Sequence, residues 1–88
     1  MARYSLLFTE TFYQNLRRIP SKDAKRILSR VNGLADDPRP SGSQKLSGRK
    51  DRYRIRQGHY RIIYSIEDDR LIVVVVKVGH RREIYDRQ

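Results

Sequence analysis

The residues best suited to chemistry are arginines in the second half of the chain. Arg54 and Arg56 stand two positions apart, and Arg61 follows after a glycine at position 58. Residues two apart on a strand point to the same face about 7 Å from each other, and a residue on the next strand of a hairpin can lie beside them. Guanidinium groups match phosphate oxygens in paired hydrogen bonds. The spacing therefore predicts a surface that binds a phosphodiester backbone.

Other basic side chains surround these arginines. The stretch 45–61 contains one acid, Asp51, and we expect four further cations to extend the phosphate-binding surface: Lys45, Arg49, Lys50 and Arg52. Like charges so close together destabilise a sheet unless something offsets them. The alternative is a solvated sheet face whose arginine stems cover apolar surface.

A second group of reactive side chains closes the chain. Gly79 follows a long apolar run, and we expect it to let the chain turn so that His80, Arg81 and Tyr85 return toward the arginines. An imidazole titrates near neutral pH, and nearby cations favour the ionised form of a phenol, so either ring could take a proton. His80 could instead be an exposed turn residue, Arg81 could pair with a nearby acid, and Tyr85 could anchor the C-terminus by packing.

The composition limits the possible partners. Twenty Lys and Arg residues against ten Asp and Glu give a net charge of +10, which predicts a polyanionic partner without choosing among RNA, DNA, an acidic protein and an anionic membrane. The chain has no cysteine, so a disulfide or thiolate metal site is excluded, and we expect neither a metal nor a cofactor. No apolar run approaches the roughly 18 residues of a membrane span. No signal peptide is recognisable either, so we expect a cytoplasmic protein without a membrane partner.

The periodicity of apolar residues predicts an α+β fold, with residues 1–88 forming a single domain. An opening strand over 2–8 leads to Thr9 as the cap of a first helix. A second helix is expected to begin at Ser21 as its N-cap and to bury one side together with the first. The Pro-, Gly- and Ser-rich stretch 36–48 predicts a loop.

The second half of the chain predicts a three-stranded antiparallel meander. Alternation over 53–57 and 60–66 predicts a hairpin with one apolar and one basic face, joined by a tight turn at Gly58. The run 71–78 is apolar on both faces apart from one lysine, which predicts a strand inside the sheet. We therefore expect a sheet of about four strands, with the helical hairpin on one face, arginines on the other and a short C-terminal segment.

Several of these features resemble one known family, the RelE group of the RelE/ParE toxin superfamily. The resemblance rests on the hairpin, the apolar strand that follows it and the closing residues, which read Tyr53-Arg54-Ile55-Arg56, Gly58, Tyr60-Arg61-Ile62-Ile63-Tyr64, Gly79-His80-Arg81 and Ile84-Tyr85. It extends to the predicted element order and so covers essentially the whole chain, although its second half is the specific part. It implies a RelE-like fold and the toxin of a type II toxin-antitoxin system.

The resemblance also implies an activity and its residues. The expected reaction is cleavage of mRNA in the ribosomal A site by attack of a ribose 2'-hydroxyl on the adjoining phosphate. Arg61 and Arg81 match the family's arginines that stabilise the transition state, and Tyr85 matches its C-terminal tyrosine. Arg54 and Arg56 stand where the family pattern has lysines, and an arginine does not act as a general base. The general base is therefore either His80 or Tyr85.

The implied partners are mRNA, the ribosome and an acidic, RelB-like antitoxin that joins the toxin in a hetero-oligomer. Two other functions remain open from the sequence. One is the ParE branch, which poisons DNA gyrase by binding and has no need of His80, Arg81 and Tyr85 beside the arginines. The other is a noncatalytic RNA-binding module that uses the basic face alone.

Overall fold

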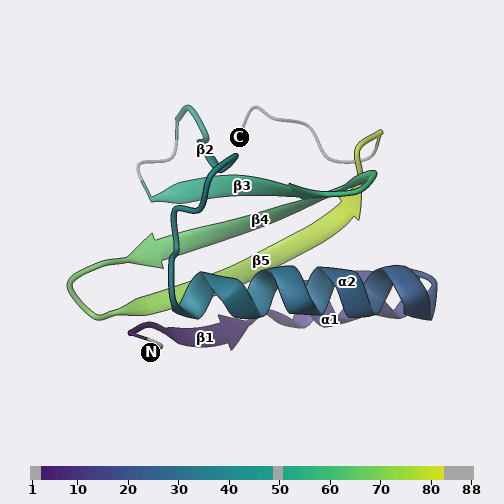
Figure 1. Cartoon of the computed structure of the whole chain (residues 1–88), viewed down its shortest axis with the longest axis horizontal. Helices are drawn as coiled ribbons and strands as arrows, with labels where there is room; N and C mark the ends of the chain where they lie inside the picture. Colours follow the sequence, from purple (N-terminus) through teal and green to yellow (C-terminus); the bar gives the residue numbers. More distant parts are fainter. Residues whose placement is uncertain (1–2, 49–50, 83–88) are drawn as a thin grey trace.

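A computed structural model describes residues 3–48 and 51–82 and has an α+β architecture. Figure 1 shows its elements in chain order, which are β1 (Ser5–Phe8), α1 (Glu10–Arg17), α2 (Ser21–Asn32), a 3-10 turn η1 (Gly33–Ala35), β2 (Gln44–Lys45), β3 (Arg52–Gln57), β4 (Tyr60–Glu67) and β5 (Ile72–His80). The predicted fold class is confirmed. Residues 83–88 of the predicted C-terminal segment lie outside the described residues.

The sheet has five strands in the order β1-β5-β4-β3-β2, one more than expected. The additional strand, β2, lies inside the predicted loop, where Gln44 pairs with Arg54 and Lys45 with Tyr53. A two-residue strand is too short to produce a periodic pattern, so the sequence gives no signal for it. Strand β1 runs parallel to β5, and the other neighbours pair antiparallel.

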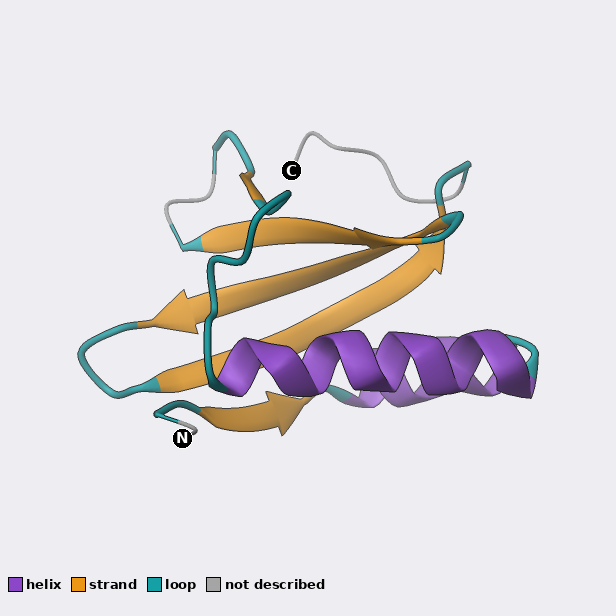
Figure 2. Cartoon of the chain, in the orientation of Figure 1, coloured by secondary structure: helices purple, strands orange, loops and turns teal. Residues whose placement is uncertain are grey.

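Both helices pack against the same face of the sheet (Figure 2). Thr9 caps α1 as predicted, because its hydroxyl accepts a hydrogen bond from the Phe12 N–H at 3.0 Å. The same hydroxyl donates to the carbonyl of Val76 at 2.6 Å, which ties the start of α1 to β5. Neither described helix is long and apolar enough to cross a membrane.

The predicted N-cap of the second helix is wrong by one residue. Ser21 is the first residue of α2, and Pro20 is the N-cap without a side-chain hydrogen bond. The carbonyl of Pro20 accepts from the N–H of Ala24 at 2.9 Å, so the helical hydrogen bonds begin one residue earlier than expected. Pro20 itself has extended backbone angles, φ −53° and ψ 142°, as an N-cap residue requires.

The main core lies between the helices and the sheet. Alternate residues of β3 and β4 enter it, together with apolar residues from both helices, η1 and β5; its buried members are Phe12, Ile27, Val31, Leu34, Ile55, Ile62, Tyr64, Ile66, Val73, Val75 and Val78. Because successive strand residues point to opposite faces, the arginines between them point away from the helices. A smaller apolar cluster of Leu46, Ile63 and Val76 forms separately from the main core.

Strand β5 begins and ends later than the predicted 71–78. Leu71 adopts a left-handed φ of 54° in the preceding turn, and the strand continues through Gly79 and His80. These last two residues remain paired with the first two residues of β4. The expected turn at Gly79 is therefore wrong, because β4 begins early enough to supply hydrogen-bonding partners to the end of β5.

Candidate nucleic-acid interface

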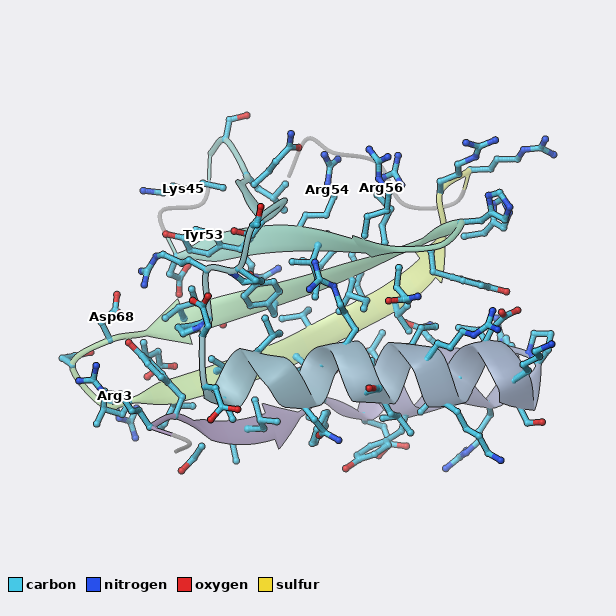
Figure 3. The ribbon with its side chains drawn as sticks, viewed as in Figure 1. Arg3, Lys45, Tyr53, Arg54, Arg56 and Asp68 are labelled. Atoms are coloured by element: carbon cyan, nitrogen blue, oxygen red, sulfur yellow. The ribbon has the colours of Figure 1, made fainter. Side chains whose placement is uncertain are left out.

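Three arginines share the face of the sheet that points away from the helices. Figure 3 shows Arg54 and Arg56 pointing the same way from β3. Arg61 of β4 is the direct cross-strand partner of Arg56, and directly opposed residues in antiparallel strands have Cβ atoms about 5 Å apart on the same face. We call Arg54, Arg56 and Arg61 the arginine face. Its convergence agrees with the expectation from sequence spacing.

Arg54 is the most buried member of the arginine face, with 8% of its surface exposed. Its cross-strand partner is Ile63 of the smaller apolar cluster, so its aliphatic stem lies beside apolar surface. The guanidinium donates a hydrogen bond to the side-chain carbonyl of Gln44. Burial lowers the pKa of Arg54, and the positive charges of Arg61 and Arg56 lower it further. A bound anion would stabilise the charged form of Arg54, because it would offset the positive charges of its neighbours.

The other predicted basic residues do not all join the arginine face. Lys45 pairs with Tyr53, whose ring packs on the helix side of the sheet, and in Figure 3 it lies apart from Arg54 and Arg56. Arg52, two residues before Arg54 on β3, does point to the same face, and it is half-buried opposite Ser65. Arg49 and Lys50 lie outside the described residues.

His80 is not brought to the arginine face. It pairs with Tyr60, whereas Arg61 pairs with Gly79, so the side chains of His80 and Arg61 leave opposite faces of the sheet. The imidazole stacks on that of His59, with ring centroids 5.9 Å apart, and meets the Tyr60 ring edge-on at the same distance. The prediction that His80 turns back toward the arginines is wrong, because β5 continues through Gly79.

The remaining predicted site residues follow β5. Arg81 is exposed in the turn after the strand, and its backbone N–H donates to the carbonyl of His59 at 2.7 Å. Tyr85 lies outside the described residues. Within residues 3–48 and 51–82, no group of three or more His, Asp or Glu side chains is arranged to hold a metal ion.

Sequence reasoning missed Gln44, the neutral residue that accepts from Arg54. Its position depends on the pairing of β2 with β3, which brings it opposite Arg54. Only knowledge of that register could have identified it, because a glutamine in a loop-like stretch carries no local signal of its own.

Comparison with known proteins decides the family. Residues 6–85 match the family described as the ParE toxin of the type II toxin-antitoxin system, parDE. The chain belongs to the RelE/ParE toxin family. Toxin RelE3 of Methanocaldococcus jannaschii is 34% identical over 87 residues, covering 92% of this chain and 94% of the relative. The mRNA interferase toxin RelE of Escherichia coli is 30% identical over 86 residues, covering 93% and 90%.

A solved structure extends the RelE/ParE likeness to three dimensions. The chain superimposes on the archaeal RelE-RelB complex from Pyrococcus horikoshii with a TM-score of 0.81 and 26% identity, covering 93% of this chain and 99% of the other. The likeness therefore includes the helices as well as the sheet. The resemblance stated from sequence motifs is confirmed for the family and the fold.

Proposed function

We propose that this RelE/ParE toxin is an endoribonuclease that cuts mRNA in the ribosomal A site. The observation that carries the proposal is the arginine face, where Arg56 and Arg61 are directly opposed and Arg54 is buried beside them. Such crowding is unfavourable in a purely structural surface and favourable for a phosphodiester, whose oxygens accept paired guanidinium hydrogen bonds. The Escherichia coli relative named mRNA interferase toxin RelE supports the same activity.

The proposed reaction takes both its nucleophile and its leaving group from the RNA itself. The 2'-oxygen of one ribose bonds to the adjacent phosphorus, and the bond from phosphorus to the 5'-oxygen breaks. The products are a 2',3'-cyclic phosphate and a 5'-hydroxyl. One group must accept the 2'-proton, cations must stabilise the pentavalent phosphorane, and the 5'-oxygen must gain a proton.

Arg61 is our candidate for stabilising the phosphorane, with Arg81 as a second donor and Arg54 and Arg56 holding the RNA backbone. Tyr85 is the better candidate for proton transfer. His80 is the weaker one, since its strand partner is Tyr60 and its ring stacks on His59, away from the arginine face. Cations near a phenol favour its ionised form, which would help Tyr85 to accept a proton.

The proposed partner is an acidic, RelB-like antitoxin that forms a hetero-oligomer with the toxin in the cytoplasm. The net charge of +10 supports such a partner, because an acidic chain over the arginine face would reduce self-repulsion and exclude RNA. The Pyrococcus relative, solved as a RelE-RelB complex, supports the same assembly.

Two assays together test the proposed function. The purified toxin is incubated with translating ribosomes and the RNA ends are mapped; in parallel, DNA gyrase supercoiling is measured with the same protein. We expect new mRNA ends inside the A-site codon and unimpaired supercoiling. Inhibited gyrase with intact mRNA would replace the proposal with the gyrase-poison function, and RNA binding without new ends would replace it with a binding module.

A further inference from the structure

A pocket opens at the edge of β3, just before β2 begins. Strand β2 pairs with β3 only at Arg54 and Tyr53, so before Gln44 the chain is no longer paired with β3. The pocket there has a volume of about 380 Å³ and is lined by Arg30, Gly42, Gln44, Arg54 and Arg56. This volume falls within the range of about 300 to 1,000 Å³ that is typical of small-ligand sites.

Arg30 reaches this pocket from a separate layer of the fold. It lies in the last turn of α2 and is half-buried. Burial raises the pKa of Tyr64 to about 12, and a hydrogen bond with Ser43 and the positive charge of Arg30 oppose that rise. The Tyr64 hydroxyl donates to the carbonyl of Pro38 at 2.7 Å, at the base of the loop that leads to Gly42. Arg30 of α2 thus lines one pocket together with Gly42 of this loop and with Arg54 and Arg56 of β3.

The lining of the pocket is suited to an anion. Three of its five lining residues are arginines, one from α2 and two from β3, and none of the five is acidic. Gln44 adds a neutral amide, and Gly42, with a left-handed φ of 92°, forms a bend in the loop beside the pocket. Arginines gathered at one cavity favour a phosphate over a neutral ligand, because their positive charges attract the anion and guanidinium groups can form charge-assisted hydrogen bonds to it.

We propose that this pocket binds a backbone phosphate of the RNA next to the one that is cleaved, and that Arg30 is a positioning residue for the substrate. The proposal rests on the proposed function. Arg56 lines the pocket and also lies opposite Arg61 on the arginine face. A single RNA strand can therefore occupy the pocket with one phosphate while its neighbour lies at Arg61.

A purely structural role for Arg30 makes a different prediction. A cation in the last turn of a helix stabilises the helix dipole. If that were its only role, substitution would lower the melting temperature and leave RNA binding unchanged. The experiment must therefore measure RNA binding under conditions in which every variant is folded.

The experiment uses the full chain and a 2'-O-methylated RNA hexanucleotide, which cannot be cut by 2'-hydroxyl attack. Affinity is measured over a range of salt concentrations for the wild type, Arg30→Gln and the control Arg26→Gln. Arg26 lies on the same helix and its substitution removes the same charge, but Arg26 lines a different pocket, together with His59. We expect Arg30→Gln to weaken binding about tenfold. We also expect it to reduce the log-log salt slope by about 0.7, the value for one phosphate contact on a single strand.

Equal losses in Arg30→Gln and Arg26→Gln would overturn the proposal, because they would show only a general effect of charge. The proposal would also be overturned if Arg30→Gln bound RNA as wild type does but bound a Glu-rich peptide more weakly, since the pocket would then be a site for carboxylates. If Arg30→Gln fails to fold, Arg30→Lys takes its place, because lysine keeps the charge and removes only the paired hydrogen-bond donors. An RNA affinity of Arg30→Lys equal to that of wild type would then contradict the proposal. None of these outcomes depends on cleavage, which the ribosome assay with wild-type protein tests separately.

Discussion

Two regions of this toxin use arginine in opposite ways. On the arginine face, the pKa of Arg54 is lowered by burial and by the charges of Arg61 and Arg56. At the other region Arg39 forms a paired salt bridge with Asp68, with distances of 2.7 Å from Nη2 to Oδ2 and 3.2 Å from Nη1 to Oδ1. The pKa of Arg39 is raised, chiefly by the bond to Asp68 and then by a bond to Tyr53.

The second region ties several segments of the chain together, and we call Tyr4, Arg39, Tyr53 and Asp68 the loop anchor. The Tyr4 hydroxyl donates to Asp68 Oδ1 at 2.7 Å, and Arg39 Nε donates to the Tyr53 hydroxyl at 3.1 Å. The anchor thus joins the residue before β1, the long loop, β3 and the turn after β4. Its charges are matched within the fold, whereas the arginine face concentrates charges of one sign.

This difference indicates which arginines are expected to bind a ligand. A charge that is paired with an opposite charge of the same chain contributes to stability and gains little from an anion. A charge that is crowded and partly desolvated contributes little to stability and gains more from a phosphate. Substitutions in the two regions should therefore separate stability from activity.

The largest effect is expected for proton transfer. Tyr85→Phe keeps the aromatic ring and removes the hydroxyl, so it should lower the rate of cleavage of ribosome-bound mRNA by about 10² to 10⁴. His80→Ala should lower the rate far less, because the imidazole stacks on His59 away from the arginine face. Single-turnover rates of the two variants test this order. A nearly inactive His80→Ala protein with an altered pH profile would make His80 the base instead.

Loss of a transition-state donor comes next. Arg61→Ala should lower the cleavage rate by about 10² to 10³, while its melting temperature stays near that of wild type because it removes one of two directly opposed arginines. Arg39→Ala is the matched control from the loop anchor. We expect it to have a lower melting temperature and a normal rate of mRNA cleavage. Equal cleavage rates in both variants would contradict the assignment of Arg61.

The third effect is on stability alone. Tyr64 is fully buried and its hydroxyl donates to the carbonyl of buried Pro38, next to Arg39 of the loop anchor. Tyr64→Phe leaves that carbonyl without its donor and should lower the free energy of unfolding by about 1 to 3 kcal/mol. Urea denaturation measures the loss. An unchanged midpoint would mean that the hydrogen bond does not hold the loop.

The smallest effect concerns pH and the loop anchor. Bonds from Arg39 and then Tyr4 lower the pKa of Asp68 from 3.8 to about 2. Because the folded pKa is lowered, the stabilisation is present above the unfolded value and is lost as pH falls from about 4 to about 2. The melting temperature of wild type should exceed that of Asp68→Asn at pH 5, and the difference should shrink over that window. A difference that stays constant down to pH 2 would contradict the lowered pKa.

The sequence predicted the arginine face because alternation alone decides which strand residues share a side. Arg54, Arg56 and Arg61 needed only the strands and the turn at Gly58 to be located, and Gly58 indeed adopts a φ of 61° between β3 and β4. The predicted helical cap at Thr9 was equally local. Features of this kind follow from neighbouring residues in the chain.

The features that the sequence did not predict depend on pairing between residues that are far apart in the sequence. Gln44 reaches Arg54 only through the register of β2 with β3. The predicted position of His80 was wrong because the length of β5 depends on where β4 begins. The apolar run of β5 does not contain that information. The loop anchor joins Arg39 to Asp68 across 29 positions, and neither residue lies in a motif.

The most direct test of the contrast compares Arg54→Met with Arg39→Met, because methionine keeps much of the arginine stem and removes the charge. The free energy of unfolding and the affinity for the 2'-O-methylated hexanucleotide are measured for both proteins. We predict that Arg54→Met is at least as stable as wild type and binds RNA about tenfold more weakly, whereas Arg39→Met is less stable and binds RNA normally. A destabilised Arg54→Met protein that keeps full RNA affinity would contradict the claim that the arginine face exists to bind phosphate.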